Sequence, residues 1–194
     1  SSDSGKTQKQ RAYYEIAADR IAQILQREEF SQASVLMSGD VGFYSGAKKL
    51  LPLLSGQDVS CIAGVSSVQY FCARLGTPWE DVRLVSLHGR EGDPVEAVQK
   101  NARVFFLTGS DHKAEDICRQ LTQAGLGRTK ISAGQRLSYG DETIVCATAQ
   151  ELAGRHFDPL TVLLAEREEA ALSETGQCGG KVQQSKSSGP GEEN

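Results

Sequence analysis

Two short loops rich in glycine and small hydroxyls are the first candidates for chemistry in this sequence. The apolar run of residues 35–37 ends in Ser38-Gly39-Asp40, and a helical pattern resumes at Ser45. In open α/β sheets, ligands bind at the carboxyl ends of strands, where glycine lets backbone N–H groups approach and the next helix N-terminus favours negative charge. This order of strand, tight turn and helix predicts a binding loop.

A second loop of this kind follows the next predicted strand, at residues 58–62. It contains Gly64, Ser66 and Ser67, and the two hydroxyls can hydrogen-bond a nucleoside or a carboxylate. A strand, a helix and a second strand in succession form a right-handed parallel unit, so both loops lie at one edge of the sheet. Glycine at such a turn often serves the turn alone, so the residues by themselves leave open whether a nucleotide-like molecule binds here.

Three charged or titratable residues in or near glycine-bearing loops have two interpretations each. Asp40 can hydrogen-bond a ribose or ammonium group or accept a proton, or it can cap the following helix. His88 can serve as an acid–base group or contact an anionic substrate, with Arg90 as a carboxylate clamp, or the two can be a solvated linker pair. Both interpretations stay open for each residue.

Serine hydrolases and metal proteins are not expected. Residues 42–46 read Gly-Phe-Tyr-Ser-Gly, which is not the Gly-x-Ser-x-Gly of a nucleophile elbow. The five cysteines are widely spaced and are predicted to be buried, reduced thiols. Neither His112 nor His156 has a partner at metal-ligand spacing, so no metal site is predicted.

The net charge and the hydropathy of the sequence indicate which kinds of partner are not expected. The formal net charge of −4 and the pI near 5.5 provide no basic field for a nucleic-acid backbone, so no nucleic-acid partner is expected. No apolar run approaches the roughly 18 residues that a membrane-spanning helix needs, and the N-terminus is polar. The sequence predicts a cytoplasmic protein with no membrane partner.

Alternating helical and strand patterns position these loops. Helical patterns cover residues 11–29, 45–54, 68–75, 113–124 and 149–153. Strand patterns cover residues 34–37, 58–62, 83–87, 104–109, 130–133, 143–148 and 160–164. We expect disordered ends at residues 1–10 and 169–194, which are too polar to form a core. Between them we expect an incomplete N-terminal α/β domain at 11–90 and a C-terminal α/β domain at 91–168.

Four segments, in order along the chain, resemble the tetrapyrrole (corrin/porphyrin) methylases. They are residues 38–46, 64–70, 86–90 and 137–142. The second and third are most similar to the family members that methylate C5 of a precorrin or cobalt-precorrin in cobalamin (vitamin B12) biosynthesis. The resemblance implies a two-domain tetrapyrrole methylase-like α/β fold, with a parallel sheet in the N-terminal domain and a mixed sheet in the C-terminal domain.

The same resemblance implies an S-adenosyl-L-methionine-dependent C-methyltransferase that releases S-adenosyl-L-homocysteine. It implies a small-molecule tetrapyrrole substrate, a homodimer, and a separate C15-methyltransferase/decarboxylase as partner. Carried over to this sequence, the cofactor-binding residues are Ser38, Gly39, Asp40, Phe43, Ser66, Ser67, Thr108 and Leu160. Those on the substrate side are Tyr44, His88 and Arg90, and Asp40 is also the candidate catalytic base.

The sequence departs from the family pattern at three points. Family members begin with a strand and a Gly-x-Gly-Pro-Gly loop, which no segment before Arg11 matches, and Val41 and Ala63 stand where the family usually has proline. Two alternatives therefore remain beside C5 methylation. The chain could be a relative that acts at a different ring carbon or on ribosomal RNA, although its acidic charge argues against the RNA substrate. It could also be a truncated, inactive domain that keeps the fold.

Overall fold

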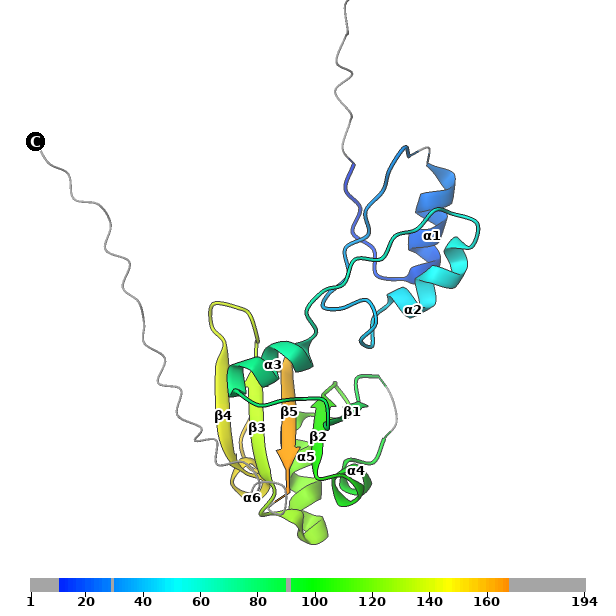
Figure 1. The fold of residues 1–194 in the computed structure, drawn as a ribbon. Helices are drawn as coiled ribbons and strands as arrows, with labels where there is room; N and C mark the ends of the chain where they lie inside the picture. Colours follow the sequence, from blue (N-terminus) through cyan, green and yellow to red (C-terminus); the bar gives the residue numbers. More distant parts are fainter. Residues whose placement is uncertain (1–10, 29, 90–91, 168–194) are drawn as a thin grey trace, which may run out of the picture. The chain divides into compact units, whose positions relative to one another are not determined.

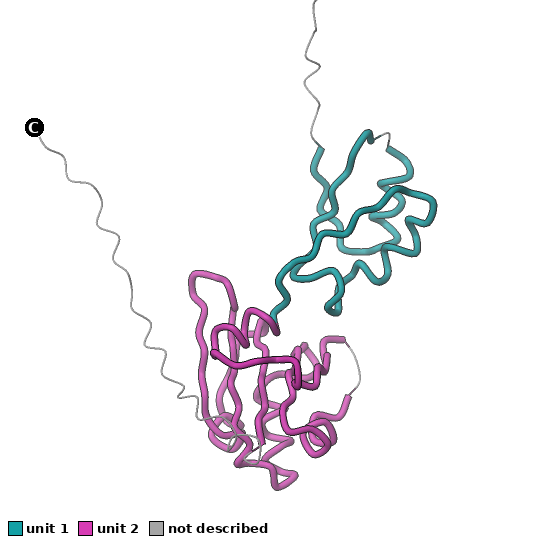
Figure 2. The backbone as a smooth tube through the Cα atoms, viewed as in Figure 1, with its two compact units in different colours: residues 1–67 teal, residues 68–194 magenta. Residues whose placement is uncertain are grey.

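In the computed structural model of this chain, the structure describes residues 11–28, 30–89 and 92–167. The chain forms two compact units, residues 1–67 and residues 68–194 (Figure 2). Each unit is described by itself below.

The described part of the first unit is helical, with extended connections (Figure 1). Helix α1 (Ala18–Arg27) packs on α2 (Ala47–Leu50) and on the 3₁₀ helix η1 (Leu51–Leu54), and Ala22, Leu50 and Leu54 form their small buried core. The helix predicted at residues 45–54 is thus confirmed. The helix predicted at 11–29 is shorter than expected and begins only at Ala18. The side chain of Glu15 accepts hydrogen bonds from the N–H groups of residues 16 and 17, which competes with helix formation before that residue.

The two strands predicted in the first unit are wrong. Residues 34–37 and 58–62 pair with no strand in the described part of the chain. An apolar sequence favours a strand, but a strand exists only where its backbone N–H and C=O groups meet those of a neighbour. The parallel sheet expected in this half of the chain is therefore not formed by these segments.

The second unit contains a five-stranded mixed sheet in the order β1-β2-β5-β3-β4. Strand β1 (Arg83–Ser86) runs parallel to β2 (Arg103–Leu107), and the remaining pairs are antiparallel. These antiparallel pairs join β2 to β5 (Thr161–Glu166), β5 to β3 (Lys130–Gln135) and β3 to β4 (Thr143–Thr148). The mixed sheet and all five of the strands predicted in this half are confirmed.

Helices cover both faces of this sheet. Helices α4 (Pro94–Lys100), α5 (Ala114–Leu121) and α6 (Ala149–Leu152) pack with the buried face that includes Val104 and Phe106, and η2 (Thr122–Leu126) continues α5. On the opposite face, the Phe71 ring of α3 (Ser67–Leu75) lies 6.5 Å from the ring of Phe105. Because successive side chains of β2 point to opposite faces of the sheet, they contribute to two separate layers of the core.

Helix α4 was not predicted, although its start is encoded locally. The carboxylate of Asp93 accepts hydrogen bonds from the N–H groups of Val95 and Glu96, at 2.8 and 3.0 Å, and Pro94 occupies the first helical turn. An Asp N-cap followed by proline is a strong helix-start signal. Gly89 and Gly92 precede this helix, and glycines of this kind are typical of a loop, so the sequence predicted a loop here.

The division into units differs from the domain boundary expected at residues 90/91. Strand β1 pairs with β2, and Leu87 is fully buried in the core of the second unit. Arg103, which is 7% exposed, also donates to Asp81 at 2.7 Å and to Glu166 at 3.2 Å. Residues 68–89 therefore belong to the second unit, because pairing and ion pairs with distant strands hold them there.

Gly134 of β3 provides a test of the packing of α3 on the sheet. A Cβ atom at this position would lie 2.6 Å from Cε2 of Phe71, so Gly134→Ala should lower the free energy of unfolding by about 1–3 kcal/mol. Gly140→Ala is the matched control, since a Cβ there would meet nothing within 4 Å, and it should change stability by less than about 0.5 kcal/mol. Denaturant unfolding of both variants measures this, and equal effects would contradict the packing described.

Candidate functional site

The two predicted loops of the first unit lie against each other, and the carboxylate of Asp40 joins them. Its Oδ1 accepts the N–H of Gly42 at 2.8 Å, within the first loop. Its Oδ2 accepts the N–H of Gly64 at 3.1 Å, in the second loop. Asp40 therefore caps no helix; it fixes the turn of its own loop and ties that loop to the next.

Each loop has a glycine at the contact, for a different reason. A Cβ atom on Gly64 would lie 2.3 Å from the carbonyl oxygen of Gly39, a distance that no packed side chain adopts. Gly39 has φ +73°, a backbone conformation that L-residues rarely adopt, although a Cβ there would lie 3.8 Å from the carbonyl oxygen of Val65, an ordinary contact. Gly64 is therefore required by the close approach of the two loops, and Gly39 by its backbone conformation.

The loop pair presents hydroxyls and two aromatic rings. Ser38 and Gly39 are exposed, whereas Ser66 is buried beside the start of α3 at Ser67. The rings of Phe43 and Tyr44 meet edge to face with centroids 5.0 Å apart. Tyr44 is held at φ +49°, a strained conformation for a bulky residue that occurs preferentially at functional positions. All seven residues that were predicted from these two loops thus lie on loops that contact each other through Asp40 and Gly64.

In the second unit, His88 and Thr108 come together at the ends of the parallel strands β1 and β2. Nδ1 of His88 lies 3.2 Å from the carbonyl oxygen of Thr108, and since a carbonyl only accepts, Nδ1 carries the proton. A Cβ on Gly109 would lie 2.9 Å from Cα of His88, so this approach also needs a glycine. Of the residues predicted here, Arg90 lies outside the described residues.

Thr108 is also linked to the start of β5. Its hydroxyl donates to the carbonyl oxygen of Thr161 at 2.6 Å, which places it one residue from the predicted contact Leu160. Leu160 is 55% exposed, and its N–H donates to Asp158 at 2.7 Å. The side chain of Leu160 is therefore available for contact, while its backbone is held in place.

The sequence did not predict the structural role of the β3–β4 loop, although residues 137–142 are one of the four segments that resemble the family. Glu142 accepts hydrogen bonds from the Tyr70 hydroxyl at 2.8 Å, the Arg74 guanidinium at 2.8 Å and the Ser138 N–H at 2.7 Å. Burial alone would raise the pKa of Glu142, but these three donors outweigh it and hold the pKa below its usual value. Arg136 and Ser138 both have positive φ, so Glu142 stabilises a strained loop against α3.

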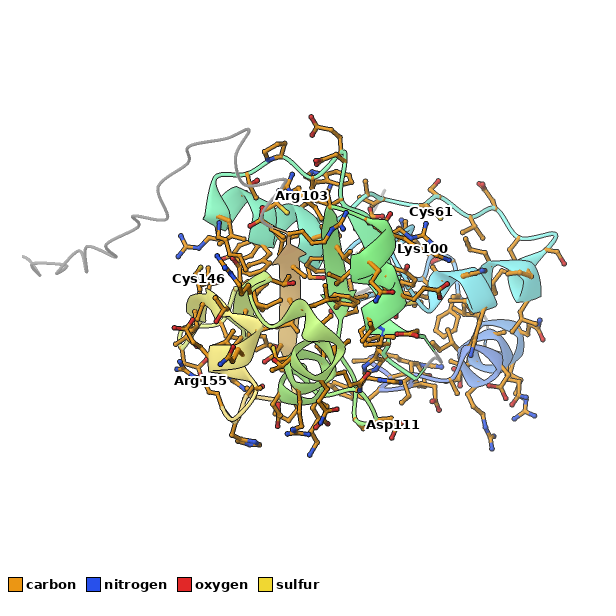
Figure 3. The ribbon with its side chains drawn as sticks, turned by 90° about the horizontal axis from the view of Figure 1, so that it is seen from below. Cys61, Lys100, Arg103, Asp111, Cys146 and Arg155 are labelled. Atoms are coloured by element: carbon orange, nitrogen blue, oxygen red, sulfur yellow. The ribbon has the colours of Figure 1, made fainter. Side chains whose placement is uncertain are left out.

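The thiols differ from the expectation that all are buried. Cys72 and Cys118 are buried, and burial raises their pKa values to about 11 and about 12. Cys61, in an extended segment without strand pairing, and Cys146, on the edge strand β4, are exposed (Figure 3), and Cys178 lies outside the described residues. No three His, Cys, Asp or Glu side chains of the described chain gather as a metal site. Within residues 11–28, 30–89 and 92–167, no helix has the length and apolar character needed to cross a membrane.

Comparison of the sequence with known proteins identifies the family to which the chain belongs. The family model of the Tetrapyrrole (Corrin/Porphyrin) Methylases matches residues 3–153, and the chain belongs to this family. It is 30% identical over 141 residues to a probable cobalt-precorrin-7 C(5)-methyltransferase of Methanocaldococcus jannaschii, covering 70% of this chain and 65% of that protein. It is 33% identical over 110 residues to the cobalt-precorrin-7 C(5)-methyltransferase of Salmonella typhimurium, covering 57% and 54%. The chain thus spans between about half and two thirds of the length of these relatives.

Solved structures agree on the fold. The precorrin-6Y methylase of Archaeoglobus fulgidus superposes with a TM-score of 0.59 at 21% identity, covering 81% of this chain and 74% of that one. The uroporphyrin-III C-methyltransferase of Thermus thermophilus complexed with S-adenosyl homocysteine superposes with a TM-score of 0.61 at 20% identity, covering 76% and 72%. At these identities the likeness confirms the predicted α/β tetrapyrrole methylase fold and nothing finer.

The contact between the loops predicts that Asp40→Ala will free both loops. Losing two hydrogen bonds to a carboxylate should destabilise the loop pair by about 1–3 kcal/mol and speed amide exchange at Gly42 and Gly64 roughly tenfold or more. Asp58→Ala is the matched control, because the exposed Asp58 carboxylate accepts no hydrogen bond from the described residues. Hydrogen–deuterium exchange measures both; unchanged exchange at Gly64 would show that Asp40 does not hold the loops.

The burial of the thiols predicts selective labelling. At mildly alkaline pH, Cys61 and Cys146 should react with an aromatic disulfide reagent roughly 100-fold faster than Cys72 and Cys118, whose raised pKa values keep them protonated. Peptide mapping by mass spectrometry reads out each site. All four should react at similar rates in denaturant, and fast labelling of Cys118 in the native protein would contradict its burial.

Proposed function

We propose that this chain is part of an S-adenosyl-L-methionine-dependent methyltransferase that acts on C5 of a precorrin or cobalt-precorrin in cobalamin biosynthesis. The observation that carries the proposal is the 30% identity over 141 residues with the Methanocaldococcus jannaschii protein. The loop pair joined by Asp40 supports a ligand site in the same stretch of chain.

The loops of the first unit suit the cofactor that we propose. Gly39 is exposed and has no side chain, so the backbone of the first loop can approach a nucleoside and a methionine chain, while Gly64 lets the two loops lie in contact. We assign the cofactor contacts to Ser38, Gly39, Asp40, Phe43, Ser66 and Ser67, with Thr108 and Leu160 from the second unit. The bound S-adenosyl homocysteine of the Thermus thermophilus relative supports this choice of cofactor.

When bound, this cofactor supplies an electrophilic methyl group on a sulfonium, and the electron-rich ring supplies the nucleophilic carbon. The share of the chain is then to orient the two molecules, to exclude water and to receive the proton that the ring carbon loses. Both carboxylate oxygens of Asp40 already accept a backbone N–H, so we assign it first to positioning the loops. Its second proposed role, as the proton acceptor, uses the lone pairs that remain.

On the substrate side we propose Tyr44, His88 and Arg90. A corrinoid precursor carries many carboxylates, which cationic and hydrogen-bonding side chains recognise. Nδ1 of His88 donates to Thr108, so Nε2 donates to a substrate carboxylate when the ring is an imidazolium and accepts a hydrogen bond when the ring is neutral. A homodimer in the cytoplasm and a separate C15-methyltransferase/decarboxylase complete the proposal, and both rest on the family resemblance.

Two other functions compete with this one. A methylase that acts on another ring carbon would share the loops and the cofactor and differ in the substrate. An incomplete domain would keep the fold and bind the cofactor weakly, an alternative that the partial coverage of both relatives keeps open.

Cofactor binding separates these alternatives. We expect calorimetry to show that S-adenosyl-L-homocysteine binds the protein, and that Gly64→Ala weakens binding at least about tenfold, since its Cβ would force the loops apart. Gly154→Ala, where a Cβ meets nothing within 4 Å, is the control and should bind normally. No heat at millimolar ligand would reject an active methyltransferase for this chain.

Product analysis tests the reaction itself. With cobalt-precorrin-7 and metal-free precursors as acceptors, mass spectrometry and carbon NMR should show one added methyl group at C5. Asp40→Asn should lower turnover; if it kept full turnover and unchanged cofactor affinity, Asp40 would not be the proton acceptor. A methyl group at another carbon would favour the related methylases.

A further inference from the structure

The β3–β4 loop, residues 136–142, presents an aromatic ring that no function described above uses. Tyr139 in this loop is 56% exposed. The guanidinium carbon of Arg136 lies 5.0 Å from the centre of the Tyr139 ring, in a cation–π contact. One face of the ring is therefore supported by the protein, and the exposed part is open to solvent. Such a ring is suited to stacking on a flat, conjugated ligand.

Hydrogen bonds hold the backbone of Tyr139 on both sides. Its N–H donates to the carbonyl oxygen of Arg136 at 3.0 Å, and its own carbonyl oxygen accepts the N–H of Glu142 at 3.1 Å. Arg136 and Ser138 are held at φ values of 48° and 69°, and strained backbone of this kind is concentrated at functional sites. A ring presented by a preformed loop loses little conformational freedom when a ligand binds.

The loop lies at the end of the sheet that carries the predicted contacts of the second unit. Strand pairing shows that β2 and β3 both end where β5 begins, and Figure 1 shows the β3–β4 loop at that end. The N–H of Arg136 donates to the carbonyl oxygen of Leu160 at 2.9 Å. On the other side of β5, the Thr108 hydroxyl donates to the carbonyl oxygen of Thr161. Tyr139 therefore shares a sheet edge with Thr108 and Leu160.

The charge around Arg136 indicates that it supports the ring and does not bind an anion. Its Nε lies 2.6 Å from Oδ2 of Asp141, and Nη1 lies 3.8 Å from Oδ2 of Asp158. Two carboxylates thus face one guanidinium, so Arg136 offers no net positive charge to the carboxylates of a ligand. What a ligand meets at this loop is the uncharged ring of Tyr139, which suits the flat face of the ligand and not its acidic substituents.

The width of the sheet indicates which of the two proposed ligands contacts Tyr139. His88 follows β1, and neighbouring strands lie about 4.8 Å apart, so the ends of β1 and β3 are roughly 14 Å apart in the order β1-β2-β5-β3. The proposed cofactor contacts Thr108 and Leu160 follow β2 and precede β5, between these two strands. A tetrapyrrole is the broader ligand, with carboxylates at its rim and a conjugated ring inside, so it suits the two outer positions.

We propose that Tyr139 is a substrate-binding residue whose ring stacks on the conjugated macrocycle of the tetrapyrrole, while His88 contacts the carboxylates at its rim. Arg136 and Glu142 act through Tyr139 as positioning residues, because one supports the ring and the other fixes the loop. The inference rests on the proposed function and adds to it a specific contact with the flat face of the substrate.

Binding of cobalt-precorrin-7 to variants at residue 139 tests the stacking contact. Tyr139→Leu removes the ring but keeps an apolar side chain, and it should weaken binding of cobalt-precorrin-7, measured by calorimetry, at least about tenfold. Tyr139→Phe keeps the ring and should bind within about twofold of the native protein. The affinity for S-adenosyl-L-homocysteine should be the same in both variants as in the native protein.

Trp79 provides the matched control. It is 41% exposed and precedes β1, at the opposite end of the sheet from His88, so Trp79→Leu should change neither affinity. Amide exchange at Ser138, whose N–H donates to Glu142 at 2.7 Å, reports whether the loop is intact in each variant. If Tyr139→Leu opens the loop, Tyr139→Trp decides: it keeps a ring at this position and should bind cobalt-precorrin-7 at least as tightly as the native protein, and weaker binding would contradict stacking.

Three further results would overturn the inference, and each has a different meaning. Unchanged binding of cobalt-precorrin-7 by Tyr139→Leu would show that the ring does not contact the substrate, and the proposed function would stand. Weaker binding of S-adenosyl-L-homocysteine by Tyr139→Leu, with the loop intact, would show that the ring contacts the cofactor instead. If the native protein bound S-adenosyl-L-homocysteine but not cobalt-precorrin-7, the proposed substrate would be wrong, and the stacking contact with it.

Discussion

The candidate site depends on the hydrogen bond that the N–H of Gly64 donates to the carboxylate of Asp40. One short carboxylate reaches two loops that are 24 residues apart in sequence, and Gly64 lets the loop backbones touch. A charged acceptor for backbone N–H groups is stronger than a neutral one, so an aspartate suits this position better than an amide would.

The two units are stabilised in different ways. In the second unit, five paired strands, a buried arginine and the Glu142 cluster bring together residues that are far apart in sequence. In the first unit, the described residues form one small helical core and no strand pair. The part of the chain that carries the predicted cofactor loops is thus also the part with the fewest tertiary constraints.

Family membership and this structure together explain why the predicted residues fall into two groups. The loop residues 38–44 and 66–67 come from the first unit, and His88, Thr108 and Leu160 come from the ends of strands or the loops beside them in the second. Each group is positioned by hydrogen bonds within its own unit, such as those of Asp40 and Thr108. The arrangement suits binding by preformed backbone geometry, which needs few charged side chains.

The sequence alone determined the elements whose signals are local and whose partners lie within the chain. Helices 45–54, 68–75 and 113–124, the five strands of the mixed sheet, and the two glycine loops all follow from periodicity and turn chemistry. Only the tertiary structure decided whether residues 34–37 and 58–62 are strands, where the chain divides, and what Asp40 and Glu142 bind. The physical reason is that pairing, burial and carboxylate contacts depend on residues far along the chain, and a local pattern carries no information about whether those partners are present.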